Sequence, residues 1–269
     1  MPNMEKRIFT FWEPAAGLPG YLSLCLRTWG KFLPDYEIVV LDYANLERWI
    51  GKDCYDESLY RDFSLPKQAD AIRCAVLKRW GGVWFDTDTI VTSGKVRDLL
   101  RPDAEFTLLG RHIGFIVARK NAVILRIWEN SIRRRIKFYA FYNRRFKWLG
   151  SRFPRFPLTR YMNRWDFLGN SILRLPLRLA GGNTFKSIDR LDVNALPELK
   201  GFTGGSLEKN YADFYFGDCP IEDALRNGGL IYLHNSWTPE RYKAISAAEF
   251  LRQDITLARM LRRILEAEA

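Results

Sequence analysis

Residues 67–91 read KQADAIRCAVLKRWGGVWFDTDTIV, and this stretch decides the fold. Its first part carries apolar residues at helical spacing, and Ser64 and Pro66 just before it are typical of a helix start. The glycine pair at 81–82 predicts the end of that helix. The short apolar run 83–85 then predicts a buried strand. A helix that leads through two glycines into a buried strand indicates an α/β protein.

The segments on either side repeat this alternation. Apolar runs at 8–12 and 37–41 predict strands, and the spacing of apolar residues across 19–32 predicts a helix between them. Strand, helix and strand in this order favour a mostly parallel central sheet flanked by helices. Three further short strands are expected, at 105–109, 114–118 and 230–233. With 269 residues, of which 47% are hydrophobic, we expect one globular domain over 1–269.

Asp86, Thr87 and Asp88 follow directly after the strand predicted at 83–85. Ligands of open α/β sheets bind beyond the carboxyl ends of the strands, so this position favours a binding site. Two neighbouring carboxylates can hold Mg²⁺ or Mn²⁺, and such an ion neutralises a diphosphate. In isolation the triplet is weak, because most such acids are solvated loop residues. The helix, glycine pair and strand before it strengthen the metal interpretation.

The run 67–91 resembles the DXD glycosyltransferases of family 32 and the bacterial capsular polysaccharide synthesis proteins. The shared pattern is an acid and an arginine on a helix, two glycines, an aromatic or aliphatic pair and D-x-D. The resemblance extends to FWEP at 11–14, to YEIVVLDYANLERWI at 36–50 and more faintly to HNSW at 234–237. It implies a Rossmann-like glycosyltransferase-A fold. It also implies a retaining enzyme that uses Mn²⁺ or Mg²⁺ to move a hexose from a nucleotide sugar.

The resemblance further implies roles for the residues that match. Asp86 would meet the ribose and the metal, with Thr87 beside it, and Asp88 would be the direct metal ligand. Asp70 and Arg73 would contact the donor sugar and its phosphates, and Arg73 with the metal would stabilise the leaving diphosphate. From the spacing alone, Asp70 and Arg73 equally fit a surface ion pair.

Two further motifs match the family outside the long run. Trp12 would stack on the base, although it equally fits a core tryptophan. His234 would complete the metal site, with Ser236 and Trp237 closing over the diphosphate, although a histidine at a strand end is often structural. Nothing in the spacing selects an acceptor base among the available acids, and the donor is open between UDP-hexose, our first expectation, and GDP-mannose.

The net charge of +11 is concentrated in one segment, because 119–178 has 16 Lys and Arg against two acids. We expect this basic aromatic segment to be an insertion of helix and loop. Drawn as a helix, 131–149 places Ile132, Ile136 and other apolar residues on one side and arginines on the other, with Phe141 among the charges. Such a helix can lie on an anionic membrane surface. The alternative is a helix that packs on the core with a solvated basic face. Residues 151–165 are predicted to be a loop.

The four cysteines show no metal-ligand spacing, and no stretch is long and apolar enough to span a bilayer. Both observations favour a cytoplasmic protein. The family resemblance implies a lipid-linked glycan acceptor in bacterial capsule, lipopolysaccharide or other surface polysaccharide synthesis, so we expect the enzyme at the inner face of the membrane. Two rival functions remain open. One is a basic nucleic-acid-binding protein, which leaves the D-x-D frame unexplained. The other is a catalytically silent membrane adaptor.

Overall fold

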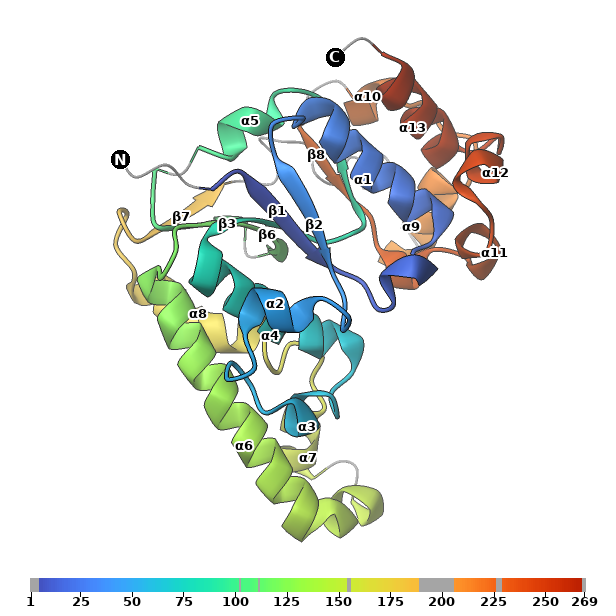
Figure 1. The fold of residues 1–269 in the computed structure, drawn as a ribbon. Helices are drawn as coiled ribbons and strands as arrows, with labels where there is room; N and C mark the ends of the chain where they lie inside the picture. The colour runs from blue at the N-terminus through green and yellow to red at the C-terminus, as the bar shows by residue number, and fades with distance from the viewer. Residues whose placement is uncertain are drawn as a thin grey trace. The chain divides into compact units, whose positions relative to one another are not determined.

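A computed structural model of the chain describes residues 5–101, 103–110, 112–153, 156–188, 206–225 and 229–267 (Figure 1). The strands are β1 (Arg7–Phe11), β2 (Glu37–Leu41), β3 (Gly82–Phe85), β4 (Thr89–Val91), β5 (Phe106–Leu109), β6 (His112–Ala118), β7 (Phe185–Ile188) and β8 (Leu230–Tyr232). The helices are α1 (Gly20–Phe32), α2 (Leu46–Ile50), α3 (Glu57–Tyr60), α4 (Leu65–Trp80), α5 (Val96–Leu99), α6 (Val123–Arg152), α7 (Pro157–Met162), α8 (Asn170–Leu179), α9 (Leu207–Tyr215), α10 (Glu222–Leu225), α11 (Glu240–Lys243), α12 (Ala247–Leu251) and α13 (Thr256–Glu266).

The strands form a six-stranded sheet in the order β2-β1-β3-β6-β5-β7 and a two-stranded sheet of β4 and β8. In the larger sheet β5 and β6 are antiparallel, with Phe106 opposite Ala118. Strand β7 runs parallel to β5, because the backbone bonds from Glu105 to Asn183 and from Phe106 to Thr184 join the beginnings of both strands. The prediction of an α/β fold with a mostly parallel sheet and flanking helices is confirmed.

The helix and strand predicted from 64–85 are present. Helix α4 has Pro66 in its first turn and ends at Gly81, whose φ of 72° is a conformation that glycine adopts readily. A side chain at this position would approach the backbone nitrogen of Lys120 to 2.7 Å. The glycine therefore serves both the turn and the close packing, and it delivers the chain into β3.

The chain divides into two compact units, which are described separately. Unit 1 contains residues 41–84 and 102–187, together with the first five residues. In it α6 packs against α4 and α8. The indole nitrogen of Trp128 on α6 donates to the carbonyl of Leu168 at 2.7 Å, and Trp128 is fully buried. One side of α6 is thus part of the core of unit 1.

Unit 2 contains residues 6–40, 85–101 and 188–269. Its core is a cluster of buried side chains from α1, α9, α12, α13 and the β4–β8 pair. Helix α1 holds β4 in place, because Trp29 donates to the carbonyl of Thr89 at 2.7 Å and the amide of Val91 donates to the hydroxyl of Thr28 at 3.0 Å. Strand β4 pairs with β8 in antiparallel register, with Ile90 opposite Ile231.

The structure differs from the sequence predictions in the basic aromatic segment. Helix α6 spans 30 residues and begins eight residues before the predicted helix at 131–149. The predicted loop at 151–165 contains α7, whose first residue is Pro157. A helix of six residues has fewer than two turns, so its apolar residues show no recognisable period. The prediction of one domain over 1–269 stays a prediction.

Candidate active site

The Asp86-Thr87-Asp88 triplet forms the turn from β3 into β4. The amide of Thr89 donates to the carbonyl of Asp86 at 3.0 Å and closes this turn. Thr87 is buried with 7% of its surface exposed, whereas both aspartates are half-buried. Two carboxylates that are held on a tight turn and still reach solvent suit contact with a soluble ligand. The predicted position of the triplet at the end of a strand is what the structure shows.

The end of β8 lies against Asp88 although it is distant in sequence. The backbone amide of Leu233 donates to the carbonyl of Asp88 at 2.9 Å. The backbone amide of Asn235 donates to the carboxylate oxygen Oδ2 of Asp88 at 3.0 Å. The pairing of β4 with β8 explains this meeting, because Thr89 is opposite Tyr232. The structure therefore brings the D-x-D triplet and the tail motif HNSW together within unit 2.

Two tyrosines support the residues beside Asp88. The hydroxyl of Tyr21 on α1 donates to Oδ1 of Asn235 at 2.5 Å. The hydroxyl of Tyr211 on α9 accepts a bond from the amide of His234 at 3.1 Å and lies 3.4 Å from the hydroxyl of Thr238. Both tyrosines are fully buried. The sequence analysis missed them, because a tyrosine within a helical apolar pattern reads as an ordinary core residue.

The surroundings of Asp88 keep these tyrosines protonated. Burial raises the pKa of both Tyr21 and Tyr211, and the negative charge of Asp88 raises it further. The same two causes raise the pKa of the Cys25 thiol on α1. Protonated hydroxyls remain hydrogen-bond donors throughout the neutral range, so the support behind Asp88 does not change with physiological pH.

Three predicted donor or metal residues lie on the tail motif. The rings of His234 and Trp237 are 4.1 Å apart, and the ring of Tyr211 meets both edge-on at 5.5 and 5.6 Å. Ser236 is exposed, and Trp237 is partly buried against the core of unit 2. Trp12, which follows the end of β1, is also partly buried against that core. Trp12 therefore packs against the core of unit 2 and is still partly exposed to solvent.

Asp70 and Arg73 belong to unit 1 and form a buried ion pair. Their charged atoms are 3.5 Å apart, and their side chains are 5% and 6% exposed. Arg73 also donates to the carbonyl of Ile113 at 2.5 Å and lies over the ring of Trp84 at 4.9 Å. The ion pair considered from the spacing is present, but it is buried and not on the surface. The role of either residue toward a donor stays a prediction.

The metal prediction can be tested against the side chains that are present. Within the described ranges, no group of three His, Cys, Asp or Glu residues could hold a metal by itself, so Asp86, Asp88 and His234 do not make a complete site. Mg²⁺ in nucleotide sites is commonly bound through one or two carboxylates together with substrate phosphates. A half-buried pair of carboxylates on one turn fits that manner of binding. The role of His234 as a metal ligand stays a prediction.

The chain is similar to one protein family in its amino-terminal part and to solved structures over more of its length. The family model described as capsular polysaccharide synthesis protein matches residues 1–134. The chain is similar to a solved structure described as PaToxG glycosyltransferase, with 14% identity, a TM-score of 0.36 and coverage of 63% of this chain and 78% of that one. A second is a glycosyltransferase involved in the glycosylation of the major capsid of PBCV-1, with 11% identity, a TM-score of 0.43 and coverage of 97% and 98%. No curated protein matches the sequence.

Residues 1–134 match the model of the capsular polysaccharide synthesis family, in agreement with the resemblance seen in the motifs. The matched residues include Asp70, Arg73 and the Asp86–Asp88 turn. His234 and Trp237 lie beyond the match, and their link to the Asp88 turn is that the neighbouring Leu233 and Asn235 donate to Asp88.

Proposed function

We propose that the protein is a retaining, metal-dependent hexosyltransferase that uses a nucleotide sugar, with UDP-hexose as the first candidate. The observation that carries this proposal is the bond from the amide of Asn235 to the carboxylate of Asp88. It fixes one carboxylate of the D-x-D turn against the tail motif, as expected if both motifs serve one donor. The acceptor is proposed to be a lipid-linked glycan at the cytoplasmic face of the membrane.

The proposal gives each of these residues a role. Asp88, oriented by the Asn235 amide, and Asp86 would hold Mn²⁺ or Mg²⁺. The ion, when bound, supplies positive charge that stabilises the departing nucleoside diphosphate. Trp12 offers a planar face for the base. The donor sugar and its phosphates are assigned to Asp70 and Arg73, by their match to the family motif.

The experiment is a thermal-shift series with UDP, GDP and CMP, each with and without Mn²⁺. A ligand at 100 times its Kd stabilises the native state by about 2.7 kcal/mol. For a chain of this size that corresponds to a rise in Tm of roughly 5–10 °C. We expect such a rise for UDP only when Mn²⁺ is present, and Asp88→Asn should abolish it. Asparagine keeps an oxygen that can accept the Asn235 amide, so this variant should fold.

Asp98→Asn is the matched control, since Asp98 lies in the same unit with a side chain that is 77% exposed. It should keep the full shift. Equal shifts with and without Mn²⁺ would remove the metal from the proposal. Absence of any nucleotide shift, together with binding of generic RNA, would favour the nucleic-acid alternative instead.

A further inference from the structure

The basic aromatic segment contains most of the exposed large apolar side chains of the described chain. Fourteen such side chains are exposed, and twelve of them lie between Val123 and Leu179. Contiguous exposed apolar surface on a soluble protein commonly marks an interaction site. None of the residues proposed for donor binding is among these twelve side chains, so their exposure requires a separate explanation.

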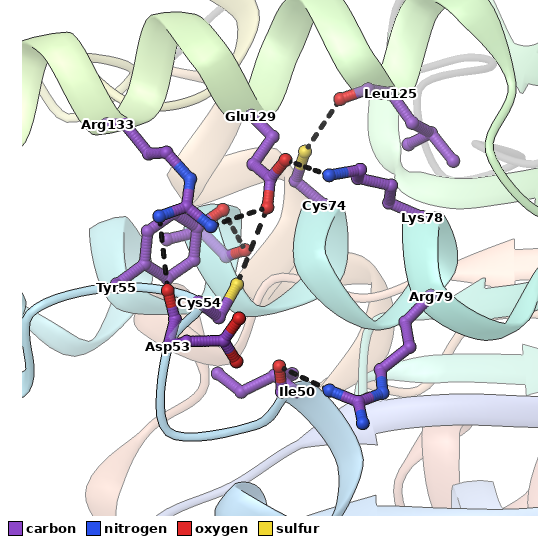
Figure 2. Close-up of polar contacts among 11 residues, drawn as sticks. Ile50, Asp53, Cys54, Tyr55, Cys74, Lys78, Arg79, Leu125, Glu129 and Arg133 are labelled. Carbon is purple, nitrogen blue, oxygen red and sulfur yellow. Dashed lines mark hydrogen bonds and ion pairs between the residues drawn. The ribbon is translucent and has the colours of Figure 1, made fainter.

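Helix α6 is held firmly along one side. Ile132, Ile136 and Tyr142 are at most 4% exposed, and the hydroxyl of Tyr142 lies 2.6 Å from that of Thr159 on α7. Near its start, Glu129 accepts bonds from Lys78 on α4 and from Arg133 (Figure 2). At 1.5 Å per residue the helix is roughly 45 Å long. It is therefore a rigid support for whatever its other side presents.

The opposite side of α6 carries aromatic and basic residues together. Phe138, Phe141 and Trp148 are 41%, 55% and 60% exposed. At 100° per residue they fall within a sector of about 80° that also contains the exposed Arg145 and Arg152. Exposed Arg134 and Lys137 extend this stripe toward the amino-terminal end. We call the face formed by these residues the aromatic-basic stripe.

The surface next to the stripe has the same character. Phe153, Phe156 and Trp165 are 51%, 42% and 69% exposed around α7. Helix α8 adds Leu175 and Leu179 at 63% and 77%. The remaining exposed members of the group are Val123, Ile127, Phe146 and Tyr161.

The segment 119–178 itself contributes no exposed acid to this surface. Helix α6 contains a single acid, Glu129, and it is 5% exposed and bound to Lys78 and Arg133. The other acid of 119–178, Asp166, is also 5% exposed and pairs with Arg164. The exposed charged side chains that this segment contributes in the described chain are thus all basic, and such a surface attracts a polyanion.

We propose that the aromatic-basic stripe, with the neighbouring surfaces of α7 and α8, docks the enzyme on an anionic phospholipid bilayer. Tryptophan and phenylalanine insert at the headgroup boundary, and Arg and Lys contact anionic headgroups. The exposed leucines of α8 favour lipid over nucleic acid, because aliphatic side chains provide no stacking for bases. No helix in the described chain is apolar and long enough to cross the bilayer, so docking would be peripheral. The proposal extends the proposed function to a partner and rests on unit 1 alone.

The test is sedimentation of the full chain with vesicles of phosphatidylcholine, compared with vesicles that also contain phosphatidylglycerol. We expect binding only to the anionic vesicles. We also expect binding to be lost in about 1 M salt, because the Debye length there is about 3 Å and charge attraction is screened. The variant Arg134→Gln with Lys137→Gln and Arg145→Gln should weaken binding on the order of 100-fold, at about fivefold for each charge. Phe141→Ala with Trp148→Ala should weaken it at unchanged charge.

The matched control removes three exposed charges from unit 2, through Lys209→Gln, Arg252→Gln and Arg263→Gln. It should keep the affinity of the unmodified protein. Equal weakening by both triple variants, or equal binding to neutral and anionic vesicles, would overturn the proposal. So would absence of vesicle binding combined with stripe-dependent binding of single-stranded RNA or an acidic polysaccharide. The thermal shift with UDP and Mn²⁺, read on the same variants, shows separately whether the donor site is intact.

Discussion

At the scale of single residues, the environment of Asp88 depends on hydroxyl groups from distant parts of the chain. The hydroxyl of Tyr21 donates to the side-chain oxygen of Asn235, and the backbone amide of Asn235 donates to the carboxylate of Asp88. Tyr21 therefore acts on this carboxylate through one intermediate residue. It is a positioning residue in this arrangement. Because it is fully buried, its hydroxyl has no access to water as a substitute partner.

Tyr21→Phe should therefore affect both stability and catalysis. Loss of one buried hydrogen bond costs about 1 kcal/mol of unfolding free energy, with more if Asn235 is left unsatisfied. We expect the kcat for sugar transfer to fall while KM for the donor changes little, because the phenyl ring keeps the packing but Asn235 is less firmly held. Urea unfolding and steady-state kinetics measure the two effects.

Thr28→Val is a control for that variant, because it also removes a buried hydroxyl of α1. The hydroxyl of Thr28 accepts from the backbone amide of Val91 and does not bond Asn235. Thr28→Val should lower stability with kcat preserved. If both variants lower kcat in proportion to their loss of stability, Tyr21 has only a structural role.

At the scale of elements, the packing of α4 against α6 includes a buried charged group. Figure 2 shows Glu129 of α6 between Lys78 of α4 and Arg133, with the Cys54 thiol donating to it at 3.6 Å. The side chains of Lys78 and Arg133 are 31% and 40% exposed, whereas that of Glu129 is 6% exposed. The two cations can regain water if their partner is lost, and the carboxylate cannot.

This asymmetry predicts different costs for the two ways of breaking the network. Lys78→Met with Arg133→Met leaves an uncompensated buried carboxylate and should cost about 3–5 kcal/mol of unfolding free energy. Glu129→Gln keeps a polar group of the same shape and should cost about 1–2 kcal/mol. Urea unfolding at neutral pH gives both values. Lys52→Met, which removes the partner of exposed Glu47, should cost less than about 1 kcal/mol. The reverse order of the first two values would contradict the burial argument.

Some elements of the fold could be predicted from the sequence alone, and some contacts of the site could not. Helix α4, the glycine turn and β3 follow from start signals, spacing and glycine, because these are local properties. The buried and exposed sides of α6 were likewise visible, since Ile132 and Ile136 are buried and Phe141 and Trp148 are exposed. The contacts of Tyr21 and Tyr211 beside the Asp88 turn were not predictable. They depend on how α1, α9 and β8 pack, and no local pattern encodes that packing.

At the scale of the whole molecule, the buried acidic groups predict how stability varies at alkaline pH. In the described chain, burial raises the pKa of three thiols and five phenols, and it brings that of the Cys54 thiol to about 12. The other groups are Cys25, Cys74, Tyr21, Tyr36, Tyr55, Tyr60 and Tyr211. Below the pKa values of the unfolded chain, about 8.5 for thiols and 10 for tyrosines, both states hold these protons and stability does not depend on them.

Above about pH 8.5 the unfolded chain releases thiol protons that the folded chain retains, so the free energy of unfolding falls as pH rises. Three thiols give a slope that approaches about 4 kcal/mol per pH unit, and tyrosines steepen it near pH 10. Urea midpoints followed by circular dichroism between pH 7.5 and 10.5 measure this decline. Cys25→Ala with Cys74→Ala should make it shallower, whereas Cys219→Ala, at a partly exposed site, should not. An unchanged slope in the double variant would show that those thiols do not govern alkaline unfolding.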